Sequence, residues 1–259
     1  MKKILTSYIV DAQQQEIGAP FMKIAATQTD AEKLILRYVS QNKYYWWTSG
    51  IIDGDIDKLT RLSDKFAELY GTLRPAHWKA YMSRKGRARA FCVAYELPNG
   101  KGKFRWYLLV TDGTGNVRDL EKLDDARIKS IDIGDLLLKE VVRPSEFGGG
   151  SRWTYLVERR VESSQDKYLF DLVKQGKDKE LAVAFRYVCG YTMHSGVRSW
   201  VRRQIRSKFT LWYKFWPNRP WPGPDPEASL PVMTMKKINF VADLTHGDRP
   251  GSADQKLVA

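Results

Sequence analysis

One predicted hairpin constrains the fold of this chain more than any other feature. Two runs rich in apolar residues, ARAFCVAYEL and FRWYLLVTDG, flank the turn sequence PNGKGK. An Asn-Gly pair between two such runs is typical of the tight turn of a β-hairpin. We therefore expect two antiparallel strands with Asn99 and Gly100 at their tip, and an antiparallel sheet built around them.

The segments on either side of this hairpin indicate an α+β fold. KYYWWTSGII before it and SRWTYLVERRV after it are rich in aromatic and β-branched residues, which predicts strands. Apolar residues at helical spacing predict a helix over about 57–70, and a second helix is expected over about 116–126. The order strand, helix, strand, strand, helix, strand over 43–161 matches a ferredoxin-like split βαβ unit, which is also the plan of RNA-recognition domains. DLLLKEVVR is compatible with either a helix or a strand.

The remaining segments suggest three regions. We expect an N-terminal hairpin (4–10 with 21–26), then a helix that a capping box at Thr29-Asp30-Ala31-Glu32 opens. Beyond Ser163 the spacing is helical until the proline-rich run PNRPWPGPDPEASLP, where a helix cannot continue. The predicted division is a core domain (1–162), a basic helical segment packed on it (163–222), and a linker with one late strand and a loose tail (223–259).

The charge of the chain is concentrated in two segments. The chain holds 43 Lys and Arg against 30 Asp and Glu, a formal charge of +13, which favours polyanionic partners such as nucleic acid or anionic lipid. Residues 73–106 hold nine basic residues and one carboxylate, and residues 181–224 hold eight basic residues and no carboxylate. This concentration favours a binding surface, with two separate solvated faces as the structural alternative.

Residues 197–216 separate into two faces when they are placed on a helix. The apolar face holds Val197, Trp200, Val201, Ile205, Phe209, Leu211, Trp212, Phe215 and Trp216. The polar face holds Ser199, Arg202, Arg203, Arg206, Thr210, Tyr213 and Lys214, while Arg198, Gln204 and Lys208 border the apolar half, where long stems extend outward. We expect the rings in the core and the arginines at the surface. A core helix with a solvated basic face and a helix lying in a lipid interface are the alternatives.

The other basic segment predicts a loop followed by an aromatic sheet. Four basic residues surround Gly86, and the expected neighbours KYYWWTSG and KFRWYLLV combine aromatic and basic groups, as single-stranded nucleic-acid binders do. A sheet core built of large rings explains the same pattern equally well. The candidate nucleic-acid-binding residues of the two segments are Arg84, Lys85, Arg87, Arg89, Lys101, Lys103, Arg105, Arg198, Arg202, Arg203, Arg206 and Lys214.

Residues 48–55, TSGIIDGD, are the strongest sign of catalysis in the chain. This stretch resembles the LAGLIDADG signature of homing endonucleases, in which a glycine lets two helices pack closely and the final acid binds the metal that activates water. The resemblance implies metal binding by Asp53 and Asp55, although Thr48 departs from the leading apolar position and Ile56 replaces the closing glycine. A strand that ends in an acidic turn is the structural alternative, with Asp55 or Asp57 capping the next helix.

Other chemical signatures are missing from the sequence. His77, His194 and His246 are too far apart for a paired-histidine metal site, and neither a P-loop nor a dinucleotide-type glycine run is present. Cys92 and Cys189 lie in apolar runs without metal-ligand spacing, which predicts reduced thiols in the core of a cytoplasmic protein. We expect no cofactor, no resident metal and no membrane span.

The interpretation that these patterns favour is an α+β nucleic-acid-binding module with a basic surface, of the kind that plasmids, phages and other mobile elements encode. DNA and RNA are not distinguished. Two alternatives stay open: a metal-dependent nucleic-acid-cleaving enzyme that uses Asp53 and Asp55, and a protein-docking accessory or inhibitor factor.

Overall fold

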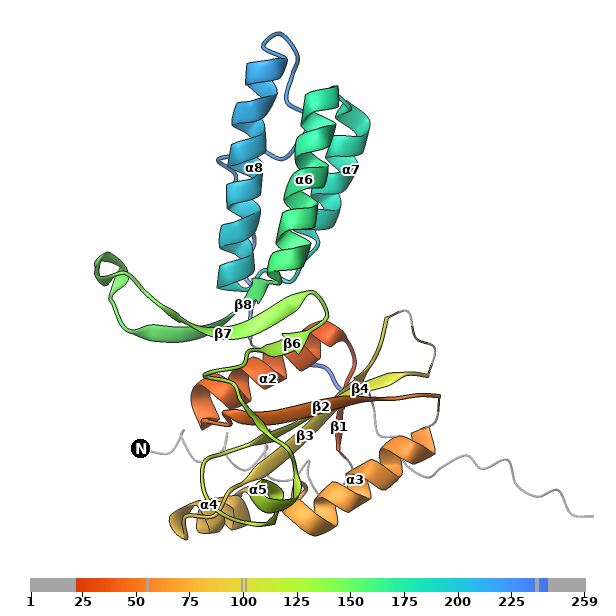
Figure 1. Ribbon diagram of the computed structural model, residues 1–259, viewed down its shortest axis with the longest axis vertical. Coiled ribbons are helices and arrows are strands. Elements are labelled where there is room, and N and C mark those ends of the chain that lie inside the picture. Colours follow the sequence, from red (N-terminus) through yellow and green to blue (C-terminus); the bar gives the residue numbers. More distant parts are fainter. Residues whose placement is uncertain (1–21, 55, 99, 101, 236–237, 242–259) are drawn as a thin grey trace, which may run out of the picture.

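The computed structural model describes residues 22–54, 56–98, 100, 102–235 and 238–241. This part of the chain forms an α+β fold with seven α-helices and two β-sheets (Figure 1). Several predicted features lie outside the described residues: the first strand of the N-terminal hairpin, Asn99 at the turn, the end of the late strand (242–244) and the loose tail (246–259).

The first sheet contains the predicted hairpin. Its strands are β1 (Lys23–Ala25), β2 (Trp46–Ile52), β3 (Ala90–Glu96), β4 (Phe104–Val110) and β5 (Asp124–Asp125), in the order β1-β3-β4-β2-β5. The antiparallel pairing of β3 with β4 is confirmed, and so is the expected neighbourhood of β2 and β4. Because β1 runs parallel to β3, the sheet is mixed, whereas we expected an antiparallel one.

Both faces of the first sheet are covered. Helix α2 (Gln28–Asn42) packs on one face, where Ile35 meets Tyr95 and Tyr107 in a shared core. Helix α3 (Ile56–Tyr70) covers the other face, and α4 (Ala76–Arg84) and α5 (Asn116–Leu120) lie beside it (Figure 1). The alternation of side chains along each strand therefore fills two separate apolar clusters.

The second sheet corrects one topological prediction. It consists of β6 (Ile131–Ile133), β7 (Leu136–Val142) and β8 (Ser151–Val157), all antiparallel. The run SRWTYLV was expected as the fourth strand of a single sheet, but it pairs along its whole length with β7, from the ambiguous segment DLLLKEVVR. A short hairpin connection, which includes the 3₁₀ turn η1 (Ser145–Phe147), supplies this nearby partner, and the two-residue strand β5 takes the place beside β2.

The C-terminal region is helical, as predicted. Helices α6 (Arg159–Gln175), α7 (Asp178–Cys189) and α8 (Ser195–Phe215) stand together above the second sheet (Figure 1). The backbone N–H of Gly196 donates to Thr154 Oγ1 (3.1 Å), and a Cβ at residue 196 would collide with the carbonyl oxygen of Tyr155. This glycine therefore allows α8 to begin directly against β8.

The boundaries of three other elements differ from prediction. The N-cap of α2 is Thr27, whose side chain accepts from the backbone N–H of Asp30, so the predicted capping box was placed two residues late. Helix α5 ends at Leu120, because the chain turns extended there and soon pairs with β2. Within the described part of the predicted late strand, one isolated bridge joins Phe240 to Ala25.

Candidate nucleic-acid interface

The predicted faces of α8 are largely confirmed. Val197, Trp200, Val201, Ile205 and Trp212 are buried, whereas the polar face is exposed at Ser199, Arg202, Arg203, Arg206, Thr210, Tyr213 and Lys214. The prediction was wrong for Phe215, which is 40% exposed at the last residue of the helix. The rings of the central turns of α8 therefore stabilise the fold, and its arginines face solvent.

We expected the side chain of Lys208 to extend toward solvent, but it does not. Its side chain is buried, and its Nζ lies 2.6 Å from Asp166 Oδ1 on α6. A buried ammonium requires such a partner, because the energy of leaving it unpaired is far larger than that of a surface charge. Lys208 is therefore part of the contact between α6 and α8.

A shallow groove runs along the exposed face of α8. Its volume is about 490 Å³, and it is lined by Ser199, Arg202, Arg203, Arg206, Ser207 and Thr210, which we call the α8 strip. These residues recur at helical spacing, so three guanidinium groups and three hydroxyl groups share one side of the helix. The lining contains no aromatic ring.

Two of the three strip arginines have acidic partners within the chain. Arg203 pairs with Glu162 on α6, and Arg206 pairs with Glu227 in the proline-rich segment at 3.2 Å. All four side chains are at least one-third exposed, so the pairs stay accessible to solvent. Arg202 has no ion pair with any carboxylate in the described part of the chain.

Sequence reasoning missed two arginines that lie near the start of α8. Arg152 shares a face of β8 with Thr154, whose hydroxyl group hydrogen-bonds the Ser195 hydroxyl of α8 (2.9 Å). Partial burial, together with the charges of Arg143 and Arg198, lowers the pKa of Arg152 below its ordinary value. Arg143, Arg152 and Arg198 are therefore close to one another, and we call them the arginine corner. The strand register that brings them together could not be read while DLLLKEVVR was ambiguous.

The other basic segment is divided between free and paired side chains. Lys103 pairs with Asp53 (3.3 Å), and Arg105 pairs with Asp132 on β6, which ties the first sheet to the second. Arg89 is half-buried, with its guanidinium 5.4 Å from the centre of the Tyr44 ring. Lys101 lies outside the described residues.

Arg84, Lys85 and Arg87 are exposed, but the segment before them is a helix, whereas we expected a loop. Helix α4 has no buried residue, so the apolar periodicity that reveals an amphipathic helix was missing from its sequence. Tyr81 is 52% exposed on this helix, and Lys85 Nζ lies 5.9 Å from the centre of its ring. We call Tyr81, Arg84, Lys85 and Arg87 the α4 surface.

We expected the two basic segments to form one surface, but the structure separates them. Figure 1 shows α4 near one end of the longest axis of the molecule and α8 at the other. Helix α2 and the second sheet lie between them. The α4 surface and the α8 strip are therefore separate places on the molecule.

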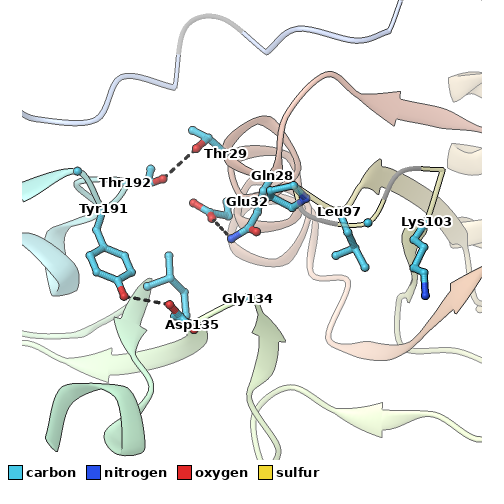
Figure 2. A pocket seen from close by; sticks show the side chains of 13 residues that line it. Gln28, Thr29, Glu32, Leu97, Lys103, Gly134, Asp135, Tyr191 and Thr192 are labelled. Carbon is cyan, nitrogen blue, oxygen red and sulfur yellow. Dashed lines mark hydrogen bonds between the residues drawn. The ribbon is translucent and has the colours of Figure 1, made fainter. Parts of the chain in front are cut away.

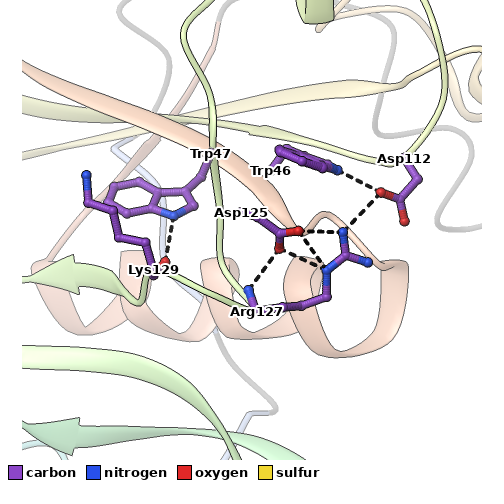
Figure 3. Close-up of polar contacts among 6 residues, drawn as sticks. All are labelled: Trp46, Trp47, Asp112, Asp125, Arg127 and Lys129. Carbon is purple, nitrogen blue, oxygen red and sulfur yellow. Dashed lines mark hydrogen bonds and ion pairs between the residues drawn. The ribbon is translucent and has the colours of Figure 1, made fainter.

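The aromatic residues of β2 are held by their neighbours and do not form an open platform. The Trp46 N–H donates to Asp112 (2.7 Å) (Figure 3). The Arg118 guanidinium lies 3.5 Å from the centre of the Trp46 ring. Arg127 reaches Asp112 and also holds Asp125 through two oxygens, which lowers the pKa of the Asp125 carboxyl. The adjacent Trp47 is buried, and its N–H donates to the Lys129 carbonyl oxygen (3.1 Å).

The stretch that resembles the endonuclease signature does not form the paired helices of that family. Thr48 to Ile52 belong to strand β2, where Gly50 leaves room for the Trp106 ring; a Cβ there would lie 2.8 Å from it. Asp53 is exposed and pairs with Lys103, while Asp55 lies outside the described residues. Within the described ranges, no cluster of three or more His, Cys, Asp or Glu side chains is placed to hold a metal ion.

A cavity lies where the two sheets and α2 meet. It has a volume of about 720 Å³ and is lined by the start of α2, the β3–β4 turn, the β6–β7 turn and the α7–α8 connection. Hydrogen bonds cross it from Thr29 to Thr192 (3.0 Å) and from the Tyr191 hydroxyl to Asp135 (2.9 Å) (Figure 2). These bonds connect the helical region to the core.

His194 is part of the same junction. Its Nε2 lies 3.1 Å from Glu32 Oε2, and both side chains are almost completely buried. The other carboxylate oxygen of Glu32 accepts from Gln28 Nε2 (3.0 Å). The pair gives a structural reason for a histidine at this position, because it links the first residues of α8 to α2.

Neither of the two cysteines forms a disulfide bond within the described residues. Cys92 is buried, Cys189 is half-buried, and both are free thiols. Among the described residues, no helix combines the length and the apolar character that crossing a membrane requires.

No protein-family model, curated protein or solved structure matches the chain.

Proposed function

We propose that this protein is a nucleic-acid-binding module that contacts the phosphate backbone through the α8 strip. The observation that carries the proposal is the gathering of three guanidinium and three hydroxyl groups in one shallow groove. Arginine suits phosphate because its planar fork of N–H donors matches two phosphate oxygens at once. Serine and threonine hydroxyl groups are also common donors to the nucleic-acid backbone. Ser199 and Thr210 donate to the carbonyl oxygens of Ser195 and Arg206 in this structure, so a phosphate would have to replace these acceptors.

The surroundings of the groove favour a double helix as the ligand. Unpaired strands are usually bound by stacking bases on exposed rings, and the groove lining offers none. The arginine corner extends the positive charge from α8 toward the β7–β8 hairpin. Contacts of this kind follow the backbone and carry no direct base information.

The acidic partners of Arg203 and Arg206 are compatible with this role. Exposed ion pairs contribute only about 0–1 kcal/mol each, so a phosphate can replace a carboxylate at little cost. The remote position of α8, at one end of the molecule, leaves its strip open to a large ligand.

We also propose a ferredoxin-like plan for the first sheet. In chain order, β2, α3, β3, β4, α5 and β5 follow the split βαβ plan, with α4 inserted between α3 and β3. The strand order β3-β4-β2-β5 supports this plan, with β1 as an additional edge strand. The fourth strand would then be β5, where we had expected β8.

The proposal is tested by reversing charge in the strip. The Arg202→Glu, Arg206→Glu variant and the wild type are compared by fluorescence anisotropy with a blunt DNA or RNA duplex, in salt from about 50 to 200 mM. We expect weaker binding and a slope of log affinity against log salt that is smaller by about 2, one unit for each phosphate that the variant no longer neutralises. Lys58→Glu, Arg61→Glu on α3 is the control, because it makes the same change in net charge at exposed positions far from α8.

Two outcomes would contradict the proposal. Unchanged affinity in the Arg202, Arg206 variant would remove α8 from the interface. A wild-type protein that binds no duplex at any salt concentration would refute the proposed function and favour the protein-docking alternative.

A further inference from the structure

The α4 surface combines positive charge with an exposed aromatic ring. Between Glu68 and Glu96 the chain contains no Asp or Glu. No ion pair joins Arg84, Lys85 or Arg87 to a carboxylate among the described residues. Unlike Arg203 and Arg206 in the α8 strip, these three cations have no acidic partner in the described structure to displace.

Helix α4 is held in place by its inner side, which leaves its outer side open. The Trp78 ring packs over Gly71, where a Cβ would lie 2.8 Å from the ring, and Lys79 Nζ donates to the Thr72 carbonyl oxygen (2.7 Å). Tyr81, Arg84 and Lys85 are three and four residues apart, so they share the outer side of the helix. The Tyr81 ring is therefore fixed on an anchored helix and stays accessible.

We propose that the α4 surface is a second nucleic-acid site, specific for an unpaired strand. A base stacks on the Tyr81 ring, and the side chains of Arg84, Lys85 and Arg87 contact the phosphates on either side. Stacking on a ring beside cations is the usual chemistry of single-strand binding, because every base has a flat face and duplex bases are not available for it. This inference rests on the proposed function, and it assigns a different form of nucleic acid to each end of the molecule.

The separation of the two sites favours a nucleic acid that contains both a duplex and an unpaired strand. A duplex on the α8 strip and an unpaired strand on the α4 surface would be bound at opposite ends of one molecule. A nucleic acid that contains both forms and is long enough to reach both sites would bind more tightly than either form alone, because the second contact becomes intramolecular.

The test uses Tyr81→Ala with Tyr81→Phe as the matched control, because the second variant keeps the ring and removes only the hydroxyl group. Anisotropy is measured with a labelled oligothymidine strand and with a blunt duplex. Loss of stacking should weaken strand binding by about 5- to 150-fold in Tyr81→Ala, with duplex binding unchanged. Tyr81→Phe should bind both ligands as the wild type does. Arg202→Glu, Arg206→Glu should show the opposite selectivity and lose duplex binding alone.

Each of the other outcomes overturns a specific statement. Wild-type protein that binds the duplex but not the strand, or Tyr81→Ala that binds the strand normally, would refute the second site and leave the proposed function intact. Binding of neither ligand would refute both. Tighter binding to phosphatidylserine vesicles than to the strand would identify the α4 surface as a lipid contact. Circular dichroism checks that Tyr81→Ala stays folded, which its exposed position leads us to expect.

Discussion

Truncation of Trp212 to Ala tests whether the two faces of α8 have been assigned correctly. The Trp212 side chain is 0% exposed, its ring packs 6.1 Å from that of Trp221, and its N–H donates to the Arg219 carbonyl oxygen at 3.2 Å. Removing a buried ring of this size costs about 3–5 kcal/mol, because both the transfer energy and the cavity count against the folded state. At about 2–4 °C per kcal/mol for a chain of this size, we expect Tm to fall by about 6–20 °C.

The measurement is thermal unfolding followed by circular dichroism or calorimetry. Lys214→Ala is the control, since Lys214 lies two residues further along the same helix, on its exposed face, and should change stability by no more than about 0.5 kcal/mol. A decrease in Tm of less than about 2 °C in Trp212→Ala would refute the assignment. A folded Trp212→Ala protein that has lost nucleic-acid binding would also refute it, because the ring would then belong to the interface.

Two further predictions concern charged residues in or next to the proposed sites. Glu162→Gln, Glu227→Gln should raise duplex affinity by about 2- to 30-fold, since each exposed pair that competes with phosphate contributes about 0.2–1 kcal/mol; equal gains in the charge-matched control Asp64→Asn, Glu68→Gln would show that only net charge matters. Burial, with the charges of Lys23 and Arg89, lowers the pKa of Lys79 to about 8. Over about pH 8–10.5 the Lys79 contribution to the free energy of unfolding should rise, because the unfolded chain binds this proton more tightly; a Lys79→Arg variant that shows the same rise in urea unfolding would contradict this statement.

The candidate sites were only partly predictable. Arg202 and Arg206 could be placed on an exposed face because the tryptophans of the same helix define the buried face. Arg143 and Arg152 could not be placed, because the face on which a strand residue lies depends on a register that the ambiguous segment DLLLKEVVR left open. Helix α4 was missed for a different reason, since none of its side chains is fully buried and its sequence lacks a strong apolar period.

Three features could be predicted from neighbouring residues alone: the β3–β4 hairpin, the amphipathic character of α8 and the end of that helix before the prolines. These follow from local periodicity and backbone restrictions, which act over a few residues. Which cations are neutralised depends on contacts between distant segments, because Arg105 and Arg203 meet acids that lie 27 and 41 residues away in the chain. Tertiary packing also places the two basic segments at opposite ends of the molecule, since the path of the chain between them, through the second sheet and helices α6 and α7, sets a distance that charge and spacing do not encode.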